Sequence, residues 1–261
     1  MKKNLTSIAV VLIIALTIVG CKKTSDVPAN KNELTPAEVA MIQAAGFSST
    51  GATILNGAYL IEGDILLTAA ELGSLSKETE THLIVANAEH YHTTKLVKYL
   101  PRTINLRYTG NYPSFQTALV TAMNRFNELN LSIKFKIDPA HHAEIKVHDV
   151  TGGPIAWSGT PTAGNPYDTI EVNTNIAGWN AKALATLLAH HLGHCIGFRH
   201  TDYRDFHGCF GAFEAVGFVG AIYIPGTPPG ADADSWMLAC IDNGTNRNFN
   251  PNDLIALRYL Y

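Results

Sequence analysis

The sequence predicts an α+β fold, with helices packed on one β-sheet and a smaller N-terminal region in front. Hydrophobic residues make up 46% of the 261 residues and charged residues only 16%, so the chain can bury a sizeable core. From residue 101 onward, segments of alternating polarity and of helical periodicity follow in the order strand, helix, strand, strand, strand, helix. That order favours a sheet with the second helix packed beneath it.

The elements of this larger part are predicted from periodicity and capping residues. Residues 131–137 alternate between apolar and polar side chains, which is the period of a half-buried strand. Ser114 is the predicted N-cap of the first helix and Asn180 that of the second, and each helix has its apolar residues on one face. The predicted strands are residues 103–108, 131–137, 144–150 and 168–172.

Residues 35–100 form the smaller N-terminal region. Thr35 before a proline predicts the start of a helix that ends at Gly46. Residues 59–67 are predicted to form one strand and residues 68–75 a short helix.

The first 21 residues predict an export signal. A short positive head precedes an uncharged apolar stretch, residues 5–20, that is shorter than a membrane span requires. Its end, Ile18-Val19-Gly20-Cys21, resembles a bacterial lipobox, which implies cleavage and lipidation of Cys21. An uncleaved anchor helix is the alternative. We expect an exported lipoprotein, anchored to a bacterial membrane on the periplasmic or cell-surface side, with a linker over residues 22–34.

Lipidation of Cys21 would leave three of the four cysteines. Three thiols allow one disulfide and one free thiol in an oxidising compartment. The pairing among Cys195, Cys209 and Cys240 stays open; a Cys209–Cys240 bond is preferred because it would tie two loop segments.

Five of the 11 histidines fall between residues 190 and 207, and three have the spacing of a metal site. His190 and His194 are four positions apart, so their imidazoles lie on one helix face and can reach one Zn²⁺ at about 2.0–2.1 Å. Gly197 lets the helix end in the left-handed conformation, and the chain can then return His200 as third ligand. Three histidines leave the fourth position for water, as in catalytic zinc sites.

Other histidines have no such pattern. Metal sites need ligands that converge in space, and these residues lie at spacings that do not repeat. We expect them at the surface; they are His82, His90, His92, His141 and His142. His207 is interpreted as a loop histidine.

Residues 190–202 resemble the metzincin motif H-E-x-x-H-x-x-G-x-x-H, and more narrowly that of the dual-action HEIGH metallopeptidases of exported bacterial proteins. Residues 234–240 resemble that family's Met-turn, which implies that Met237 lies beneath the zinc, and residues 252–261 resemble its closing helix. The resemblance covers residues 101–261. It implies a metzincin-like (zincin) domain with a mixed twisted sheet and an active-site helix, and it suggests a propeptide-like role for residues 35–100.

One position departs from this pattern. The family has Glu directly after the first histidine, where this chain has His191. In the family that glutamate takes a proton from the attacking water and passes it to the leaving amine. A neutral imidazole carries no negative charge, and its protonated form is disfavoured beside Zn²⁺. Loss of a general base typically costs about 10²–10⁴ in rate.

Other groups are weighed for this role. His191 itself can act as a weak base, and Asp205 and Glu214 follow the third histidine. Asp202 is better interpreted as a carboxylate that fixes a loop or a ligand.

Other ligand sets are also possible. His191 and His194 could bind the metal as an i,i+3 pair, with His190 turned outward. A purely structural zinc would need a fourth protein ligand such as Cys195, which points about 100° away from His194 on the helix.

The sequence thus predicts an exported zinc metallopeptidase-family protein with an intact three-histidine site and absent or strongly reduced peptide hydrolysis. One alternative is an active zinc endopeptidase, whose edge strand binds an extended substrate. Another is a zinc-loaded pseudopeptidase that captures a peptide or protein partner without cutting it. The net charge of −3 and the lack of a basic run argue against nucleic acid as a partner.

Overall fold

The computed structural model describes residues 33–79, 90–138, 140, 142–202, 221–229 and 232–261. The chain separates into a unit of residues 1–31, which lies outside the described residues, and a unit of residues 32–261. Everything below refers to the second unit, so Cys21 and the export signal remain predictions. Within the described part of the chain, no helix has both the length and the apolarity needed to cross a bilayer.

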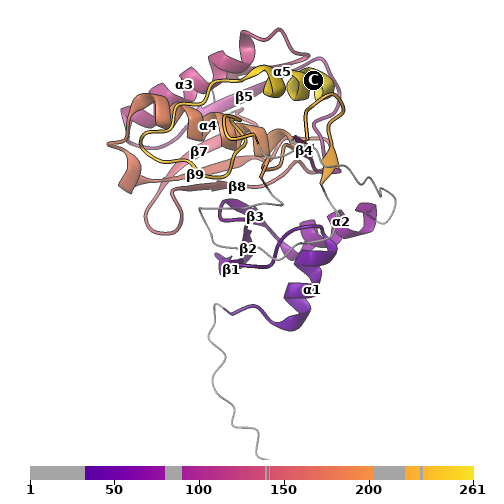
Figure 1. Ribbon diagram of the computed structural model, residues 1–261. Coiled ribbons are helices and arrows are strands. Elements are labelled where there is room, and N and C mark those ends of the chain that lie inside the picture. The colour runs from indigo at the N-terminus through magenta and orange to yellow at the C-terminus, as the bar shows by residue number, and fades with distance from the viewer. Residues whose placement is uncertain (1–32, 80–89, 139, 141, 203–220, 230–231) are drawn as a thin grey trace, which may run out of the picture. The chain divides into compact units, whose positions relative to one another are not determined.

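A mixed eight-stranded sheet runs through this unit (Figure 1). The strands are β1 (Thr53–Leu55), β2 (Ala58–Ile61), β3 (Ile65–Leu67), β4 (Tyr91–His92), β5 (Arg102–Tyr108), β6 (Ile133–Ile137), β7 (Ile145–Val150), β8 (Ala156–Ser158), β9 (Thr169–Asn173) and β10 (Ile222–Tyr223). The sheet order is β1-β2-β3-β8-β9-β7-β5-β6, and β10 pairs with β4 separately. β5, β6, β7 and β9 are parallel, whereas β8 is antiparallel to β9.

Among the described residues, the two longest helices, Pro113–Asn127 and Ala181–Ile196, pack against each other and against these strands. The helices are α1 (Pro36–Ala44), α2 (Ala69–Thr79), α3 (Pro113–Asn127), α4 (Ala181–Ile196) and α5 (Pro251–Leu260). Leu119 and Phe126 of α3 and Leu188 of α4 are buried in one core with the sheet residues. The α+β architecture with a helix beneath a mixed sheet is therefore confirmed.

The N-terminal elements have a small core of their own. Ile42 and Phe47 pack with Ile61, Ile65 and Leu72, whereas the large core starts at Val97 among the described residues. In Figure 1 these elements, α1, α2 and β1 to β3, gather at one end of the unit. They nevertheless extend the sheet, because β3 pairs with β8.

The prediction of one strand over residues 59–67 is wrong. Glu62 and Gly63 have positive φ angles of 52° and 84°, which reverse the chain, so β2 and β3 form an antiparallel hairpin with Ile61 opposite Ile65. A purely apolar pattern does not show where such a turn falls. The turn carries Asp64.

The predicted N-cap of α3 is also wrong by two residues. Pro113 takes the first helical position, where its missing N–H is harmless, so the cap is Tyr112. Ser114 lies inside the helix and its hydroxyl donates to the carbonyl of Ala177 at 2.9 Å.

Two of the histidines expected at the surface are buried. His90 and His92 are 1% and 8% exposed, because β4 pairs with β10 and bridges to Phe198. His142 is exposed as predicted, and His82 and His141 lie outside the described residues.

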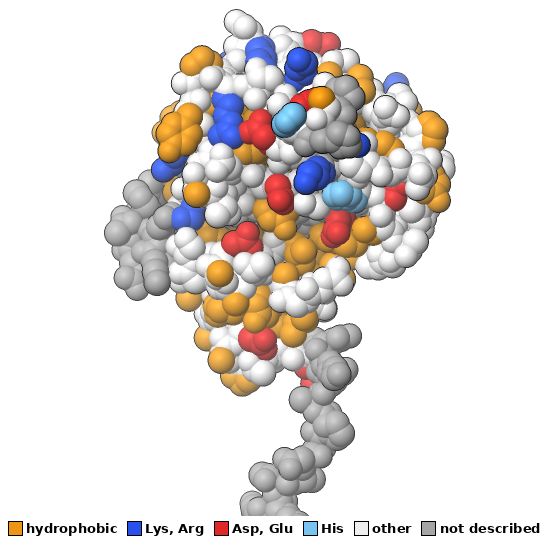
Figure 2. All heavy atoms as spheres, turned by 180° about the vertical axis from the view of Figure 1, so that it is seen from behind, with side chains coloured by type: hydrophobic (Ala, Val, Ile, Leu, Met, Phe, Trp, Pro, Cys, Tyr) orange, Lys and Arg blue, Asp and Glu red, His pale blue; other side chains and the backbone are white. Residues whose placement is uncertain are grey.

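Charged side chains are mixed on the face seen in Figure 2. Lys and Arg stand among Asp and Glu there, with hydrophobic side chains between them. The charges that this view shows therefore form no single-sign patch.

Candidate metal centre

Helix α4 presents His190 and His194 on one buried face. Asn180 caps the helix, its side chain accepting from the N–H of Lys182. Both imidazoles are completely buried, and their ring centroids lie 4.5 Å apart. The spacing of one helical turn produces this arrangement.

Gly197 ends α4 and turns the chain back toward the site. Its φ of 114° is left-handed, and a Cβ here would lie 2.5 Å from the carbonyl oxygen of Lys95. Only glycine meets both conditions without strain. Three residues later the buried His200 ring stacks on that of His190, with centroids 5.1 Å apart.

Backbone carbonyls fix the orientation of two of these rings. His190 Nδ1 lies 2.9 Å from the carbonyl oxygen of Trp236, and His194 Nδ1 lies 2.9 Å from that of Phe198. A carbonyl only accepts, so each Nδ1 carries the proton and each Nε2 presents a lone pair. This is the second layer of contacts that metal-binding histidines normally have.

The three Nε2 atoms converge on one point. His190 and His194 Nε2 are 2.9 Å apart, and each is 3.2 Å from His200 Nε2. The Nε2 lone pairs of His190 and His194 face each other at 2.9 Å, and they repel unless a proton or a metal ion lies between them. Ligands at about 2.0–2.1 Å around a tetrahedral Zn²⁺ are about 3.3–3.4 Å apart, so these residues fit zinc.

The fourth corner of this tetrahedron is taken by Asp64. Its Oδ2 lies 3.1 Å from His190 Nε2, 3.6 Å from His194 Nε2 and 3.3 Å from His200 Nε2. Among the described residues, these four side chains are the one group of His, Cys, Asp and Glu that can hold a metal ion. The sequence pattern predicts water at the fourth position and does not include this carboxylate.

The electrostatics of the site favour a positive charge at its centre. Burial disfavours the charged form of His200, but the carboxylates of Asp64 and Glu62 outweigh it and raise the pKa of His200 to about 10. Burial raises the pKa of Asp64, yet His200 and His194 hold it well below its usual value. A cation bound among the imidazoles would be stabilised by the negative charge of the Asp64 carboxylate beside it.

His191 lies beside the cluster without joining it. Its ring centroid is 5.4 Å from that of His190 and 5.9 Å from that of His194. Its Nδ1 is hydrogen-bonded to Ser158 Oγ of β8 at 3.0 Å, and its buried Nε2 has no hydrogen-bond partner among the described residues. Burial lowers the pKa of His191 well below its usual value, so the ring is neutral.

A pocket of about 510 Å³ opens next to His191. Asp64 and Gly63 line it from the N-terminal turn, while Ala156 and Leu187 line it from the larger part of the chain. The position of the missing glutamate therefore faces the same space as the fourth ligand.

A buried ion pair joins the N-terminal turn to the residue before His200. The guanidinium of Arg199 donates to Glu62, and the two side chains are 0% and 1% exposed. Arg199 also donates to the carbonyl of Gly46 at 2.7 Å and lies 4.0 Å from the ring centre of Phe47. The other oxygen of Glu62 lies 3.4 Å from His200 Nδ1, so Glu62 contacts the outer nitrogen of the third histidine.

Glu62, Asp64 and Arg199 are absent from the site residues that sequence patterns predict. The sequence gives one indication of the two acidic residues: Glu62 and Asp64 interrupt an otherwise apolar run, residues 59–67. Carboxylates are rarely buried unless they are paired, but the pattern does not name their partners.

The segment around Met237 packs beneath α4. A Cβ on Gly193 would lie 2.4 Å from the Trp236 ring and 2.6 Å from the Met237 sulfur, so glycine is required there. The hydroxyl of Ser235 donates to Asp253 of α5 at 2.7 Å, which ties this segment to the last helix. Met237 is fully buried, and its carbonyl accepts from Thr201.

The remaining candidates do not enter the cluster. Asp202 is 7% exposed and accepts from the N–H of Ala239 at 3.1 Å, as a loop-fixing carboxylate would. Cys195 is a buried free thiol, and Cys240 is disulfide-bonded. Asp205, His207, Cys209 and Glu214 also lie outside them.

Comparison with known proteins identifies relatives of the chain. Residues 59–261 match the model of the dual-action HEIGH metallo-peptidase family, and this range includes the turn with Glu62 and Asp64. No curated protein matches the chain significantly.

Two solved structures of myroilysin are similar at low identity. The first is 16% identical with a TM-score of 0.36 and covers 42% of this chain and 54% of that chain. The second is 13% identical with a TM-score of 0.41 and covers 67% of this chain and 92% of that chain. The chain thus spans about half the length of the first, and likenesses this distant support no conclusion about chemistry.

Proposed function

The chain belongs to the dual-action HEIGH metallopeptidase family, and from this premise we propose that it is an exported zinc-binding member in which peptide hydrolysis is absent or strongly reduced. The observation that carries the proposal is the pairing of a tetrahedral donor set with His191 in the position of the motif glutamate. The four donor atoms support metal binding. The histidine at position 191, where the family has glutamate, supports weak or absent catalysis.

His190, His194 and His200 would hold the metal through Nε2. Zn²⁺ bound there would supply a Lewis acid that polarises a peptide carbonyl and activates water. The carbonyls of Trp236 and Phe198 keep the two α4 imidazoles in the tautomer that binds a cation. These two imidazoles are therefore oriented by the larger part of the chain, whereas His200 also contacts Glu62 of the N-terminal turn.

Proton transfer is the step that the chain supports poorly. His191 is buried and neutral, so it offers one nitrogen lone pair and no negative charge. A general base contributes about 10²–10⁴ in rate, and we assign a loss of this size to the change from Glu to His191.

Two alternatives differ in what His191 does. The free Nε2 of His191 beside the pocket favours an active endopeptidase that uses His191 as a weak base. The same pocket without proton transfer would suit a pseudopeptidase that binds a peptide or protein segment. Both require zinc, and only the first predicts zinc-dependent cleavage by the native chain.

We expect the purified native protein to hold about one Zn²⁺ per chain. His190→Ala and His194→Ala should lose it because each removes one converging Nε2, whereas His142→Ala, at an exposed histidine, should keep it. Elemental analysis of the three variants measures this directly. A native chain without zinc would refute the proposal, and zinc-dependent casein cleavage at an ordinary peptidase rate would refute its claim of reduced activity.

We also propose that the chain is anchored to a membrane through a lipid on Cys21. A Cys21→Ala chain should fail to incorporate labelled palmitate and should leave the membrane fraction, while Thr24→Ala should behave as the native chain. Retention of Cys21→Ala in the membrane without label would favour an uncleaved anchor helix instead.

A further inference from the structure

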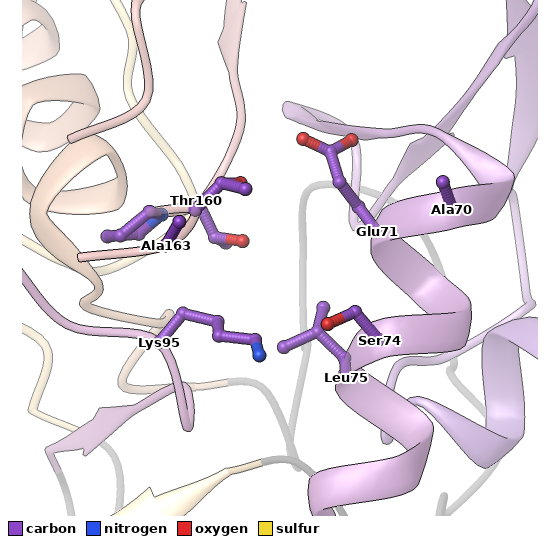
Figure 3. A pocket seen from close by; sticks show the side chains of 9 residues that line it. Ala70, Glu71, Ser74, Leu75, Lys95, Thr160 and Ala163 are labelled. Carbon is purple, nitrogen blue, oxygen red and sulfur yellow. The ribbon is translucent and has the colours of Figure 1, made fainter. Parts of the chain in front are cut away.

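We propose that the pocket between α2 and residues 160–163 is a second binding site, which takes a small zwitterion such as a free amino acid or a dipeptide. The pocket has a volume of about 380 Å³, which lies within the range of small-molecule sites in proteins. One wall carries a carboxylate, the opposite wall carries an ammonium, and the lining between them is mostly apolar (Figure 3). The described residues that line the pocket include none of the four metal-binding side chains, so this site is distinct from the metal centre.

Glu71 supplies the negative charge. Figure 3 shows its side chain on the α2 side of the pocket, above Ser74 and Leu75. Its Oε2 accepts from the backbone N–H and the hydroxyl of Thr68, at 2.7 and 2.8 Å, which fixes the carboxylate at the start of the helix. A group that is already fixed loses little conformational freedom when it binds a ligand. The carboxylate is therefore a preorganised acceptor for the ammonium end of a zwitterion.

Lys95 supplies the positive charge from the opposite wall. In Figure 3 its side chain extends from the larger part of the chain toward Ser74 and Leu75 of α2. Its backbone is fixed, because its N–H donates to the Thr93 hydroxyl at 3.1 Å and its carbonyl accepts from that hydroxyl at 2.7 Å. The N–H of Thr93 in turn donates to the carbonyl of Gly197, at the end of α4, at 2.9 Å. The ammonium thus extends from an anchored backbone and can pair with the carboxylate end of a ligand.

The rest of the lining suits an aliphatic side chain and a peptide bond. Its apolar residues are Ala70, Leu75, Pro161 and Ala163. Residues 160–163 are held in place because the N–H groups of Thr162 and Asn165 each donate to the other's carbonyl at 3.0 Å. Thr160 and Thr162 add hydroxyls that can bond a peptide group. A mostly apolar pocket with a few fixed polar groups is the usual form of a small-molecule site.

The test is ligand-observed NMR of the full chain with glycyl-L-leucine as the probe and L-leucine beside it. Three analogues of the dipeptide remove its charges: the N-acetyl form lacks the ammonium, the amide lacks the carboxylate, and the N-acetyl amide lacks both. The zwitterion should bind about 10–100-fold more tightly than either singly charged analogue, because each analogue loses one hydrogen-bonded charge pair. Every titration is repeated with EDTA, which should change nothing.

Substitutions locate the probe. Lys95→Met and Glu71→Gln should each weaken binding of glycyl-L-leucine about 10–100-fold, whereas Lys182→Met and Glu33→Gln, at exposed positions outside the pocket, should leave it unchanged. In Lys95→Met the dipeptide and its amide should bind equally, because the group that distinguishes them is gone. Ser74 is an exposed residue that lines the pocket, so Ser74→Trp should fill the space and abolish binding.

Circular dichroism is measured for every variant, and the analogue series on the native chain decides even where a variant misfolds. The proposal is overturned if the native chain binds neither glycyl-L-leucine nor L-leucine at millimolar concentration, or if it binds the zwitterion and the uncharged analogue equally. Loss of binding in EDTA would place the probe on a metal ion and overturn it as well. The proposed zinc function is independent of these results, because metal content measures it separately.

Discussion

In a chain that carries Asp64→Ala, the further change His191→Glu is expected to raise zinc-dependent peptide cleavage by about 10²–10⁴-fold. The first substitution opens the fourth ligand position, and the second restores a carboxylate beside it. Because His191 lines the same pocket as Asp64, a carboxylate at this position faces the space in which a substrate carbonyl would lie. The measurement is kcat/KM for an unstructured peptide, normalised to zinc content.

Two matched variants separate charge from shape. His191→Gln in the same Asp64→Ala background keeps a neutral side chain and should show no gain. His191→Glu with Asp64 intact should show almost no peptide cleavage, because the Asp64 carboxylate still occupies the fourth ligand position. Cleavage by Asp64→Ala alone at the rate of the double variant would mean that His191 or another group already acts as base. A zinc-loaded double variant without activity would mean that the missing glutamate is not the defect.

Arg199→Met is expected to destabilise the folded chain by about 3–5 kcal/mol, because it leaves the Glu62 carboxylate buried without its cation. Both side chains are at most 1% exposed, so water cannot replace the lost partner. Urea unfolding at a fixed zinc concentration measures the change in the free energy of unfolding.

The chain offers a control for this prediction in a more exposed pair. Arg102 lies 2.5 Å from Glu144, and their side chains are 20% and 28% exposed, so Arg102→Met should cost about 1 kcal/mol or less. The double change Arg199→Met with Glu62→Gln should regain much of the loss, since no unpaired charge remains. Equal midpoints for Arg199→Met and Arg102→Met would show that the Arg199–Glu62 pair is not held in a dry environment.

The larger part of the fold and the three histidines follow from local patterns. The alternation in residues 131–137 and the one-sided apolar face of α3 arise from backbone periods that neighbouring residues share. The same is true of His190, His194 and Gly197, because helical spacing and a left-handed end are properties of a short segment. His200 lies only three residues beyond that end.

The fourth ligand, the pairing of β3 with β8 and the buried ion pair depend on contacts between distant segments. Asp64 is 126 residues from His190, and Glu62 is 137 residues from Arg199. Periodicity describes a residue's own segment and carries no information about which distant segment packs against it. For the same reason the sequence does not predict the burial of His90 and His92. The sequence alone thus establishes a zinc-type histidine site with an altered base position. The folded chain adds that Asp64 lies with the three histidines and that β3 pairs with β8, because only packing brings these distant segments together.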